Sequence, residues 1–395
     1  MSPSAANDFQ IFVKPVGASC NLRCSYCYYI EKQESRNIRG SRCMADETLE
    51  KYIREHVEAT NEKVLFFSWH GGEPLLAGMD FYRKALALQR KYCPAEMAIV
   101  NGIQTNGTLL DESWCSFFAE ACFQVGISLD GPEYLHNTFR QNPVGGETFK
   151  KVMQGFDLLV MHGIDPEILC VVNAVNVKYP LEVYRFFRHL GVPYITFIPL
   201  VEPAGKDADV SDRSVNPMDF GRFLCAVFDE WLEKDIGEVK VQIFEEALRT
   251  AFHQDHSLCI FKPECGCIPV IEQNGDFYSC DHFVNSQYRL GNISDKTVKQ
   301  LLESDKQLAF GRAKKDNLPR CCRICEVLDM CHGECPKNRF MAASDGEPGL
   351  NYLCAGYKMF FSHCKPFVEA VAGTFEMEPR SKNQDPRQGQ VYSDK

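Results

Sequence analysis

The sequence is short of basic residues and lacks long apolar runs. Its 395 residues include 43 Lys and Arg against 53 Asp and Glu, which gives a net charge of −10. Because binding to a nucleic-acid backbone needs clustered Lys and Arg, we expect neither DNA nor RNA as a partner. No apolar run reaches the ~20 residues of a membrane span, so we expect a soluble protein. The segment Met1 to Gln10 has neither the basic patch nor the apolar run of a signal peptide, which predicts a cytoplasmic location.

Cysteine, in contrast, is abundant, with 20 residues. In a chain without an export signal these thiols are expected to stay reduced and to bind metal rather than to form disulfides. Three of them lie close together at Cys20, Cys24 and Cys27, and eleven fall between Cys259 and Cys364. The cysteine distribution therefore predicts metal sites towards both ends of the chain.

The first half of the chain alternates short β-rich runs with segments of helical period. This alternation predicts parallel strands joined by crossover helices. The expected strands are residues 11–16, 64–69, 98–104, 124–128, 167–173 and 194–198. The expected helices are residues 46–60, 80–92, 111–121, 148–162 and 180–190. Six such units predict an α/β fold with a partial (β/α)6 barrel, which binds ligands beyond the carboxyl ends of its strands.

The stretch 201–217 is rich in Pro, Gly, Asp and Ser and predicts a loop. Helices are expected over residues 220–233 and 243–252. Further on, Gln273, Asn274 and Gly275 have the composition of a β-hairpin turn. No internal repeat is visible.

We place a domain boundary near Asp235. The prediction is a barrel domain over residues 1–234 and a small cysteine-rich domain over residues 235–378. The last residues, 379–395, are polar and charged, which predicts a disordered tail.

The first motif is formed by Cys20, Cys24 and Cys27, directly after the first predicted strand. Three thiolates can hold three irons of a [4Fe–4S] cluster and leave the fourth iron open. A structural zinc ion is the alternative, but it needs four ligands, and no Cys or His follows within the next dozen residues. Chance burial of core cysteines is a second alternative. The spacing favours a cluster.

Other polar motifs also follow predicted strands. Gly72, beside a second glycine, lets the backbone approach a ligand closely, and Glu73 can bind an ammonium group, although such a segment is commonly only a turn. Ser128 and Asp130 end a later strand, where helix capping is the alternative role. Arg140 is a further candidate for ligand binding, with a solvated surface charge as the alternative role. Their expected position on one rim of the barrel favours binding.

The cysteine-rich half contains ten candidate ligands. Eight would complete two further four-iron clusters, so two would be spare, and a pair of zinc ribbons is the alternative. The ten are Cys259, Cys265, Cys267, Cys280, Cys321, Cys322, Cys325, Cys331, Cys335 and Cys354. The remaining cysteines, predicted as apolar core, are Cys43, Cys93, Cys115, Cys122, Cys170, Cys225 and Cys364.

With these motifs in this order, the sequence resembles the radical S-adenosylmethionine (SAM) superfamily. The three-cysteine cluster of that family cleaves SAM to a 5'-deoxyadenosyl radical. The resemblance implies that Cys20, Cys24 and Cys27 hold this cluster. It also implies contacts to SAM from Tyr26, Gly72, Glu73, Ser128, Arg140 and Val201, of which Tyr26 would lie against the adenine. Simple packing of the loop is the alternative for Tyr26.

The run of cysteines from Cys322 onwards resembles the SPASM domain, an auxiliary-cluster module of radical SAM enzymes that modify peptides. The resemblance implies one auxiliary [4Fe–4S] cluster on Cys259, Cys265, Cys280 and Cys335. It implies another on Cys322, Cys325, Cys331 and Cys354, for three [4Fe–4S] clusters in all. Cys267 and Cys321 are left unassigned.

Over nearly its whole length the sequence resembles the anaerobic sulfatase-maturating enzymes, in segments such as residues 104–109, 111–114 and 289–293. Those enzymes oxidise a Cys or Ser of a sulfatase to Cα-formylglycine. The resemblance implies that Asp281 is the base that takes the proton of the substrate thiol or hydroxyl. A solvated turn residue or an orienter of the cysteine loop is the alternative. His70 departs from the pattern, since close relatives can carry Gln there.

The family implies an unfolded or nascent sulfatase as substrate and a flavodoxin or ferredoxin as electron donor, with a monomer as the default state. One alternative is another SPASM peptide maturase that forms thioether or carbon–carbon crosslinks. Such enzymes commonly carry an N-terminal domain that binds the precursor, whereas here the first strand is expected about a dozen residues from Met1. An alternative of another class is a non-catalytic zinc-binding regulatory protein.

Overall fold

A computed structural model of the chain describes residues 9–29, 43–204 and 209–377. The segment 379–395, for which the sequence predicts a disordered tail, lies outside these residues.

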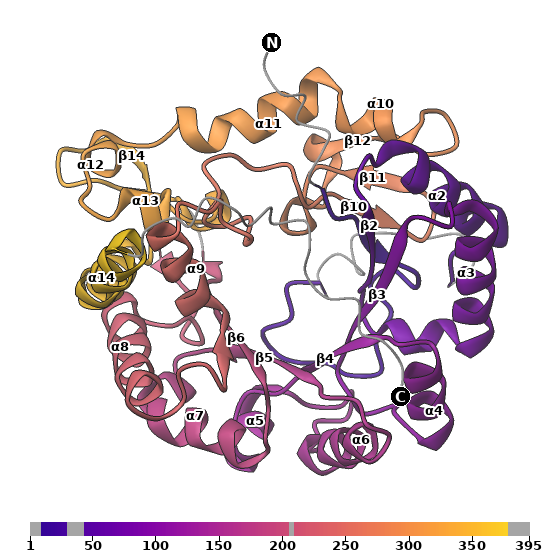
Figure 1. Ribbon diagram of the computed structural model, residues 1–395, viewed down its shortest axis with the longest axis horizontal. Helices are drawn as coiled ribbons and strands as arrows, with labels where there is room; N and C mark the ends of the chain where they lie inside the picture. Colours follow the sequence, from indigo (N-terminus) through magenta and orange to yellow (C-terminus); the bar gives the residue numbers. More distant parts are fainter. Residues whose placement is uncertain (1–8, 30–42, 205–208, 378–395) are drawn as a thin grey trace.

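The centre of the fold is a sheet of ten strands in the order β12-β11-β10-β1-β2-β3-β4-β5-β6-β9. Strands β1 to β6 are neighbours in chain order and are all parallel. Their bounds are Phe12–Lys14 (β1), Val64–Trp69 (β2), Ala98–Thr105 (β3), Gln124–Ser128 (β4), Glu167–Val172 (β5) and Tyr194–Pro199 (β6). The sheet curves into an open ring with helices on its outer side (Figure 1). The predicted partial (β/α)6 barrel is confirmed.

Helices cover the outer face of this sheet because every second strand residue is apolar and points towards them. In β2, Leu65, Phe67 and Trp69 are buried, whereas Phe66 between them is 44% exposed on the inner face. The helices are α2 (Asp46–Ala59), α3 (Met79–Tyr92), α4 (Glu112–Glu120), α5 (Glu133–Phe139), α6 (Phe149–Met161), α7 (Pro180–His189) and α8 (Pro217–Lys234). The sequence does not predict α5, because seven residues are too few to show a helical period.

The cysteine-rich half extends the same sheet at both edges. Strand β10 (Val270–Glu272) pairs parallel with β1, and β11 (Asp276–Tyr278) and β12 (Arg289–Asn292) follow it antiparallel. The turn between β10 and β11 is the predicted turn at residues 273–275. At the opposite edge, β9 (Lys240–Val241) pairs with β6. The sheet therefore runs across the boundary that the sequence predicts near Asp235.

The remaining elements are short, apart from two helices of the cysteine-rich half. The predicted loop 201–217 contains the short hairpin β7–β8. Its last residue, Pro217, begins α8, because proline is favoured in the first helical turn. These elements are η1 (Pro74–Ala77), η2 (Asn176–Lys178), β7 (Pro203–Ala204), β8 (Asp209–Val210), α9 (Gln242–Ala251), η3 (Asp281–Phe283), η4 (Ser286–Tyr288), α10 (Val298–Leu302), α11 (Asp305–Asp316), α12 (Arg320–Arg323), α13 (Leu328–Cys331), η5 (Pro336–Asn338), β13 (Met341–Ala342), β14 (Pro348–Leu350) and α14 (Cys354–Met377).

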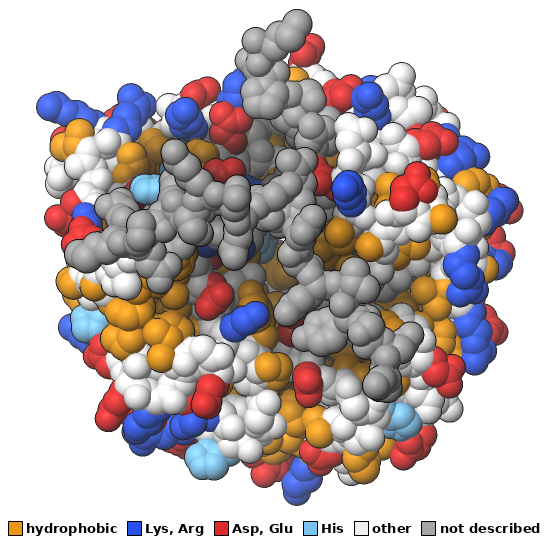
Figure 2. Space-filling model, viewed as in Figure 1, with side chains coloured by type: hydrophobic (Ala, Val, Ile, Leu, Met, Phe, Trp, Pro, Cys, Tyr) orange, Lys and Arg blue, Asp and Glu red, His pale blue; other side chains and the backbone are white. Residues whose placement is uncertain are grey.

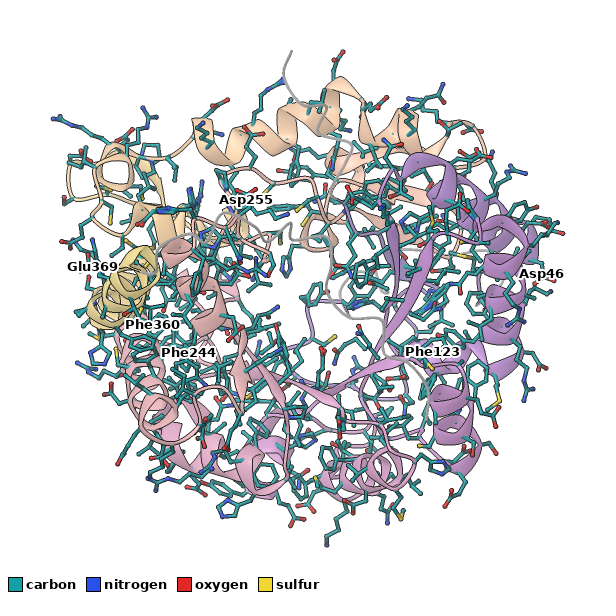
Figure 3. The ribbon with its side chains drawn as sticks, viewed as in Figure 1. Asp46, Phe123, Phe244, Asp255, Phe360 and Glu369 are labelled. Carbon is teal, nitrogen blue, oxygen red and sulfur yellow. The ribbon has the colours of Figure 1, made fainter. Side chains whose placement is uncertain are left out.

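The C-terminal helix α14 packs against α8 and α9 of the barrel side. Phe360 of α14 and Phe244 of α9 lie side by side (Figure 3), with ring centroids 5.5 Å apart. The helix has 24 residues, but Lys358, Lys365 and Glu369 interrupt its apolar surface. None of the helices in the described part of the chain is both long and apolar enough to cross a membrane.

The seven cysteines predicted as core differ in burial, and Cys43, Cys93 and Cys225 are half-buried. Cys115, Cys170 and Cys364 are buried, as predicted. For Cys122 the prediction is wrong: it is exposed, because it sits at the end of α4 in a turn with φ of 53°.

Candidate active site

The three predicted cluster cysteines lie in the loop that follows β1. The Sγ atom of Cys20 accepts hydrogen bonds from the Leu22 N–H at 3.3 Å and the Asn106 side-chain amide at 3.7 Å. Burial, and to a smaller extent the neighbouring Cys24 and Cys27, raises the pKa of Cys20 to about 12. Thiols this close do not all ionise without a compensating cation, and a bound metal replaces the thiol proton. The loop thus fits an iron–sulfur cluster.

The Gly-Gly-Glu loop after β2 packs backbone to backbone on the cysteine loop. The N–H of Gly72 donates to Gly17 O and that of Glu73 to Ser19 O, both at 2.8 Å. A Cβ atom on Gly72 would lie 2.1 Å from Ser19 O. Only glycine therefore allows the two loops to approach each other, which explains its place in the motif.

The Glu73 carboxylate joins the loop after β2 to the end of β3. It accepts hydrogen bonds from Thr105 Oγ1 at 2.8 Å, Asn106 N at 2.8 Å and Leu75 N at 3.1 Å. Burial raises the pKa of Glu73 to about 7. The side chain is 0% exposed, so these three contacts fix the shape of the loop. Asn106, whose backbone N–H donates to Glu73, also donates to Cys20 Sγ through its side-chain amide.

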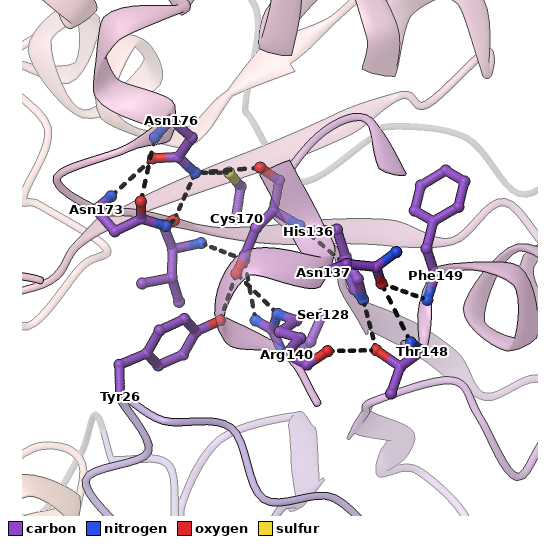
Figure 4. Close-up of polar contacts among 12 residues, drawn as sticks. Tyr26, Ser128, His136, Asn137, Arg140, Thr148, Phe149, Cys170, Asn173 and Asn176 are labelled. Atoms are coloured by element: carbon purple, nitrogen blue, oxygen red, sulfur yellow. Dashed lines mark hydrogen bonds and ion pairs between the residues drawn. The ribbon is translucent and has the colours of Figure 1, made fainter. Parts of the chain in front are cut away.

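Asp130 is the centre of a second network, in which Tyr26 and Arg140 reach the same carboxylate (Figure 4). Arg140 approaches it at 3.0 and 3.1 Å, and the N–H of Val171 donates to it at 3.0 Å. The guanidinium also lies 5.6 Å from the centre of the Tyr26 ring. Arg140 is 6% exposed, so it is not a solvated surface charge. The sequence motif contains Asp130 but does not reveal that it positions both residues.

The other two predicted SAM contacts lie at the same end of the barrel. Gln104 Nε2, at the end of β3, donates to Ser128 Oγ, at the end of β4, at 3.2 Å. Val201 is buried just beyond β6, and its carbonyl accepts from Lys337 Nζ at 3.0 Å. Lys337 belongs to the cysteine-rich half, so Val201 lies where the two halves meet.

Asp281, the predicted base, begins η3 and lies against the first strand. Lys14 Nζ is 2.8 Å from Asp281 Oδ1, and Tyr28 Oη donates to Asp281 Oδ2 at 2.6 Å. Tyr28 directly follows Cys27, so the carboxylate lies beside the first cysteine loop. The sequence predicts neither contact, because Lys14 and Tyr28 are both more than 250 residues from Asp281 in the chain. The structure thus brings Asp281 to the rim that holds the other candidate residues.

Cys259, Cys265, Cys280 and Cys335 come together from separate segments. Burial raises the pKa of Cys259, and the thiols of Cys280 and Cys265 raise it further. Burial likewise raises the pKa of Cys335, with smaller contributions from Cys280 and Cys259. Cys267 lies close enough to raise the pKa of Cys259 as well. The four thiols implied by the resemblance are therefore neighbours, and Cys267 is a fifth.

A second group contains Cys322, Cys325, Cys331 and Cys354. Burial raises the pKa of Cys331 to about 12, with contributions from Cys354 and Cys322. Burial also raises the pKa of Cys354, as do Cys325 and Cys321. Cys321 is exposed at the edge of this group.

Two cations lie next to these groups and were not identified from the sequence. Lys314 is 1% exposed, and its Nζ donates to the carbonyl of Cys259 at 2.9 Å. The thiols of Cys265 and Cys259 favour its charged form, although burial lowers the pKa of Lys314 overall. Arg339 lies near Cys265 of the first group and Cys322 of the second. Such positive charge offsets the negative charge of thiolate-ligated iron.

The donor sets fit [4Fe–4S] clusters in number and chemistry, with three thiols at the first site and four or more at each of the others. In a cube each thiolate binds a different iron, so the sulfur atoms need not converge on one point. In the described ranges no three His, Cys, Asp or Glu side chains converge closely enough to hold one metal ion.

Comparison with known protein families gives two matches. Residues 15–188 match the radical SAM superfamily, and residues 259–326 match an iron–sulfur cluster-binding domain, SPASM. The first match contains the loops after β1 to β5, and the second contains the first auxiliary cysteine group except Cys335.

Curated relatives match over nearly the whole chain. The serine-type anaerobic sulfatase-maturating enzyme of Bacteroides thetaiotaomicron is 44% identical over 378 residues, covering 92% of this chain and 91% of that protein. The cysteine-type enzyme of Clostridium perfringens strain 13 is 34% identical, covering 93% and 99%. A solved structure, native anSMEcpe with bound AdoMet and Cp18Cys peptide, superimposes with a TM-score of 0.84 at 34% identity, covering 93% and 99%.

Proposed function

The chain belongs to the anaerobic sulfatase-maturating enzymes of the radical SAM superfamily, and we propose that it oxidises a Cys or Ser of a sulfatase to Cα-formylglycine with Asp281 as base. The observation that carries this assignment is the position of Asp281. This residue of the cysteine-rich half is paired with Lys14, beside the loop of Cys20, Cys24 and Cys27. A proton acceptor is thereby brought to the place where the radical is generated.

The residues at the barrel rim divide into cluster ligands and SAM contacts. Cys20, Cys24 and Cys27 hold the first cluster, which with SAM supplies the 5'-deoxyadenosyl radical that removes a hydrogen atom from the substrate Cβ. The SAM contacts are Tyr26, Gly72, Glu73, Ser128, Arg140 and Val201. Asp130 orients the Tyr26 ring and the Arg140 guanidinium, and the buried Glu73 carboxylate holds the shape of the loop that would bind the ammonium group of SAM.

Asp281 accepts the proton of the substrate thiol or hydroxyl when the second electron leaves. Lys14 and Tyr28 fix its carboxylate by two contacts, so the oxygen is in place before the substrate arrives. The electron balance is even, because SAM cleavage consumes one electron and oxidation of the substrate radical releases one.

The two further groups hold the auxiliary clusters. We assign Cys259, Cys265, Cys280 and Cys335 to one and Cys322, Cys325, Cys331 and Cys354 to the other. Four thiolates at each would leave no open iron for the substrate, so these clusters would carry electrons between the barrel rim and the protein surface, including the one that the substrate radical releases. The buried Lys314 and the neighbouring Arg339 stabilise their negative charge.

The substrate is a sulfatase polypeptide that is still unfolded or nascent, because its target side chain must reach the barrel rim. A flavodoxin or ferredoxin supplies the electron for SAM cleavage. We place the enzyme in the cytoplasm, where thiols stay reduced and nascent chains are accessible.

The test is an anaerobic assay on the reconstituted enzyme with SAM, a chemical reductant and a sulfatase-motif peptide, with Cys and Ser peptides run separately. We expect 5'-deoxyadenosine together with the loss of two hydrogens from the Ser peptide, or the matching conversion of Cys to the aldehyde. Asp281→Asn should abolish peptide oxidation while the protein keeps its iron and its SAM affinity. SAM cleavage without any change of either peptide would overturn the proposed substrate.

A further inference from the structure

The cysteine-rich half carries a basic segment that the proposed chemistry does not use. Residues 304–325 contain six Lys and Arg but only two Asp, a net charge of +4 in a chain whose total is −10. This segment comprises α11 and α12. The charge is therefore concentrated, rather than scattered over the surface.

Five of the six cations are exposed, and together they define the basic surface: Lys306, Arg312, Lys315, Arg320 and Arg323. Among the residues that the structure describes, none of the five forms an ion pair with an acidic side chain. Figure 2 shows Lys and Arg side chains gathered along the upper left edge of the molecule, over α11 and α12. The positive charge is thus available to a partner.

The basic surface also has an apolar centre next to predicted cluster ligands. Ile324 is 77% exposed and stands between Arg323 and Cys325, a half-buried member of the second auxiliary group. An exposed apolar residue ringed by charges is typical of a protein interface, with an apolar centre and a polar rim. This is also a place where the second auxiliary group approaches the surface, since Cys321 beside it is exposed.

A cavity of about 800 Å³ opens beside this surface. Its lining includes the rings of Phe283, Tyr288 and Phe310 and the cations Lys306 and Arg323. Lys314 and Arg339 also line it, so its cations outnumber its two acidic residues, Asp316 and Glu347, and an apolar side chain flanked by carboxylates fits such a lining. The basic surface therefore offers a partner a cavity as well as positive charge.

We propose that the basic surface docks an acidic electron-carrier protein of the flavodoxin type, with Ile324 at the centre of the interface. The proposal rests on the proposed function, which needs a carrier that exchanges single electrons. Docking here brings the carrier within a short distance of Cys322 and Cys325, and electron transfer slows steeply with distance. A nucleic acid is a poorer fit, because the surface has an exposed apolar residue at its centre, which suits a protein partner better than a phosphate backbone.

The test compares two triple variants of the reconstituted enzyme with the wild type. The first, Arg312→Glu with Lys315→Glu and Arg320→Glu, reverses the basic surface without touching a cysteine. The second, Lys63→Glu with Arg90→Glu and Lys151→Glu, makes the same charge change at exposed residues near β2 and on α3 and α6. For each protein we would measure the affinity for purified flavodoxin at several salt concentrations. Peptide oxidation would be measured with reduced flavodoxin and, separately, with dithionite.

For the first variant we expect flavodoxin affinity about tenfold lower at low salt, a flatter dependence on salt, and a matching loss of flavodoxin-driven turnover. Turnover with dithionite and the KM for the peptide should stay at the wild-type values, and the control variant should match the wild type. Failure of turnover with dithionite in the wild type would instead contradict the proposed function.

Three results would overturn the docking proposal. They are an unchanged flavodoxin affinity in the first variant, an equal loss in the control variant, or no measurable binding of flavodoxin to the wild type. A raised peptide KM in the first variant would show that the surface binds the sulfatase substrate, and would overturn it as well.

Discussion

Lys14 on the first strand and Asp281 in the cysteine-rich half form an ion pair, with Nζ and Oδ1 2.8 Å apart. The Lys14 side chain is 2% exposed and that of Asp281 13% exposed. A pair this buried is costly to break, because the remaining partner is left as an uncompensated charge. The pair therefore fixes the predicted base and also fastens β10 and η3 to the barrel.

The first prediction separates these two roles. Lys14→Met should lower the free energy of unfolding by about 3 kcal/mol, because it strands the Asp281 carboxylate in a buried site. The double variant Lys14→Met with Asp281→Asn should regain part of that stability, since the Asp281 charge is removed and only the buried Glu272, opposite Lys14 in the sheet, keeps an acidic side chain there. It should still fail to oxidise the peptide. Thermal unfolding and the peptide assay measure the two effects, and a double variant as unstable as the single one would contradict the pairing.

The second prediction concerns Asp130. Asp130→Asn removes the carboxylate that Arg140 and Tyr26 share, so both lose their orientation. We expect SAM affinity to fall about tenfold, measured by equilibrium binding to the reconstituted enzyme, because a charge-assisted hydrogen bond contributes ~1.5–3 kcal/mol. Asp111→Asn is the matched control: Asp111 caps α4 through Trp114 N at 2.9 Å, and Asn caps equally well. Equal SAM affinity in both variants would exclude a positioning role for Asp130.

The third prediction tests the contact between the first two loops. Gly72→Ala places a Cβ atom 2.1 Å from Ser19 O, so the cysteine loop must move. We expect iron content to fall by one cluster and SAM cleavage to stop, while the auxiliary clusters remain. Gly102→Ala in β3 serves as control, because a Cβ atom there meets no atom within 4 Å. If Gly72→Ala retains all its iron and cleaves SAM, the packing argument fails.

The fourth prediction concerns the buried cation Lys314. Lys314→Met removes a positive charge near Cys259 and Cys265, which makes reduction of an adjacent cluster less favourable. We expect one auxiliary cluster to shift to a lower reduction potential by on the order of 50 mV. Redox titration followed by electron paramagnetic resonance measures the shift. Lys306→Met on the same helix is exposed, so solvent screening should leave the potential nearly unchanged; an equal shift there would refute the local effect of Lys314.

Much of the barrel follows from local patterns. Strand β2 is a short run of mostly apolar and aromatic residues, VLFFSW, of the length and composition typical of a strand. The Gln-Asn-Gly turn before β11 is equally local, since its residues favour the tight turn by their own backbone preferences. The motif cysteines were identified for the same reason, because a cluster loop needs its thiols at close spacing in the chain.

Contacts between distant segments could not be predicted. Nothing near Lys14 indicates an ion pair with Asp281, and nothing near Arg339 places it between two cysteine groups. The partners of Asp130 were not predicted either, because Tyr26 comes from the first cysteine loop and Val171 from β5.

The sequence alone determined the order of the six barrel strands and of most helices between them, the three-cysteine loop, the Gly-Gly-Glu loop and the set of candidate ligands, because each depends on residues that are close together in the chain. Only the tertiary structure decided that β10 extends the barrel sheet beside β1, so that Asp281 meets Lys14 and Tyr28 at the rim. The physical reason is that spacing and backbone preference are local properties. The partner of a buried charge is set by how the whole chain packs.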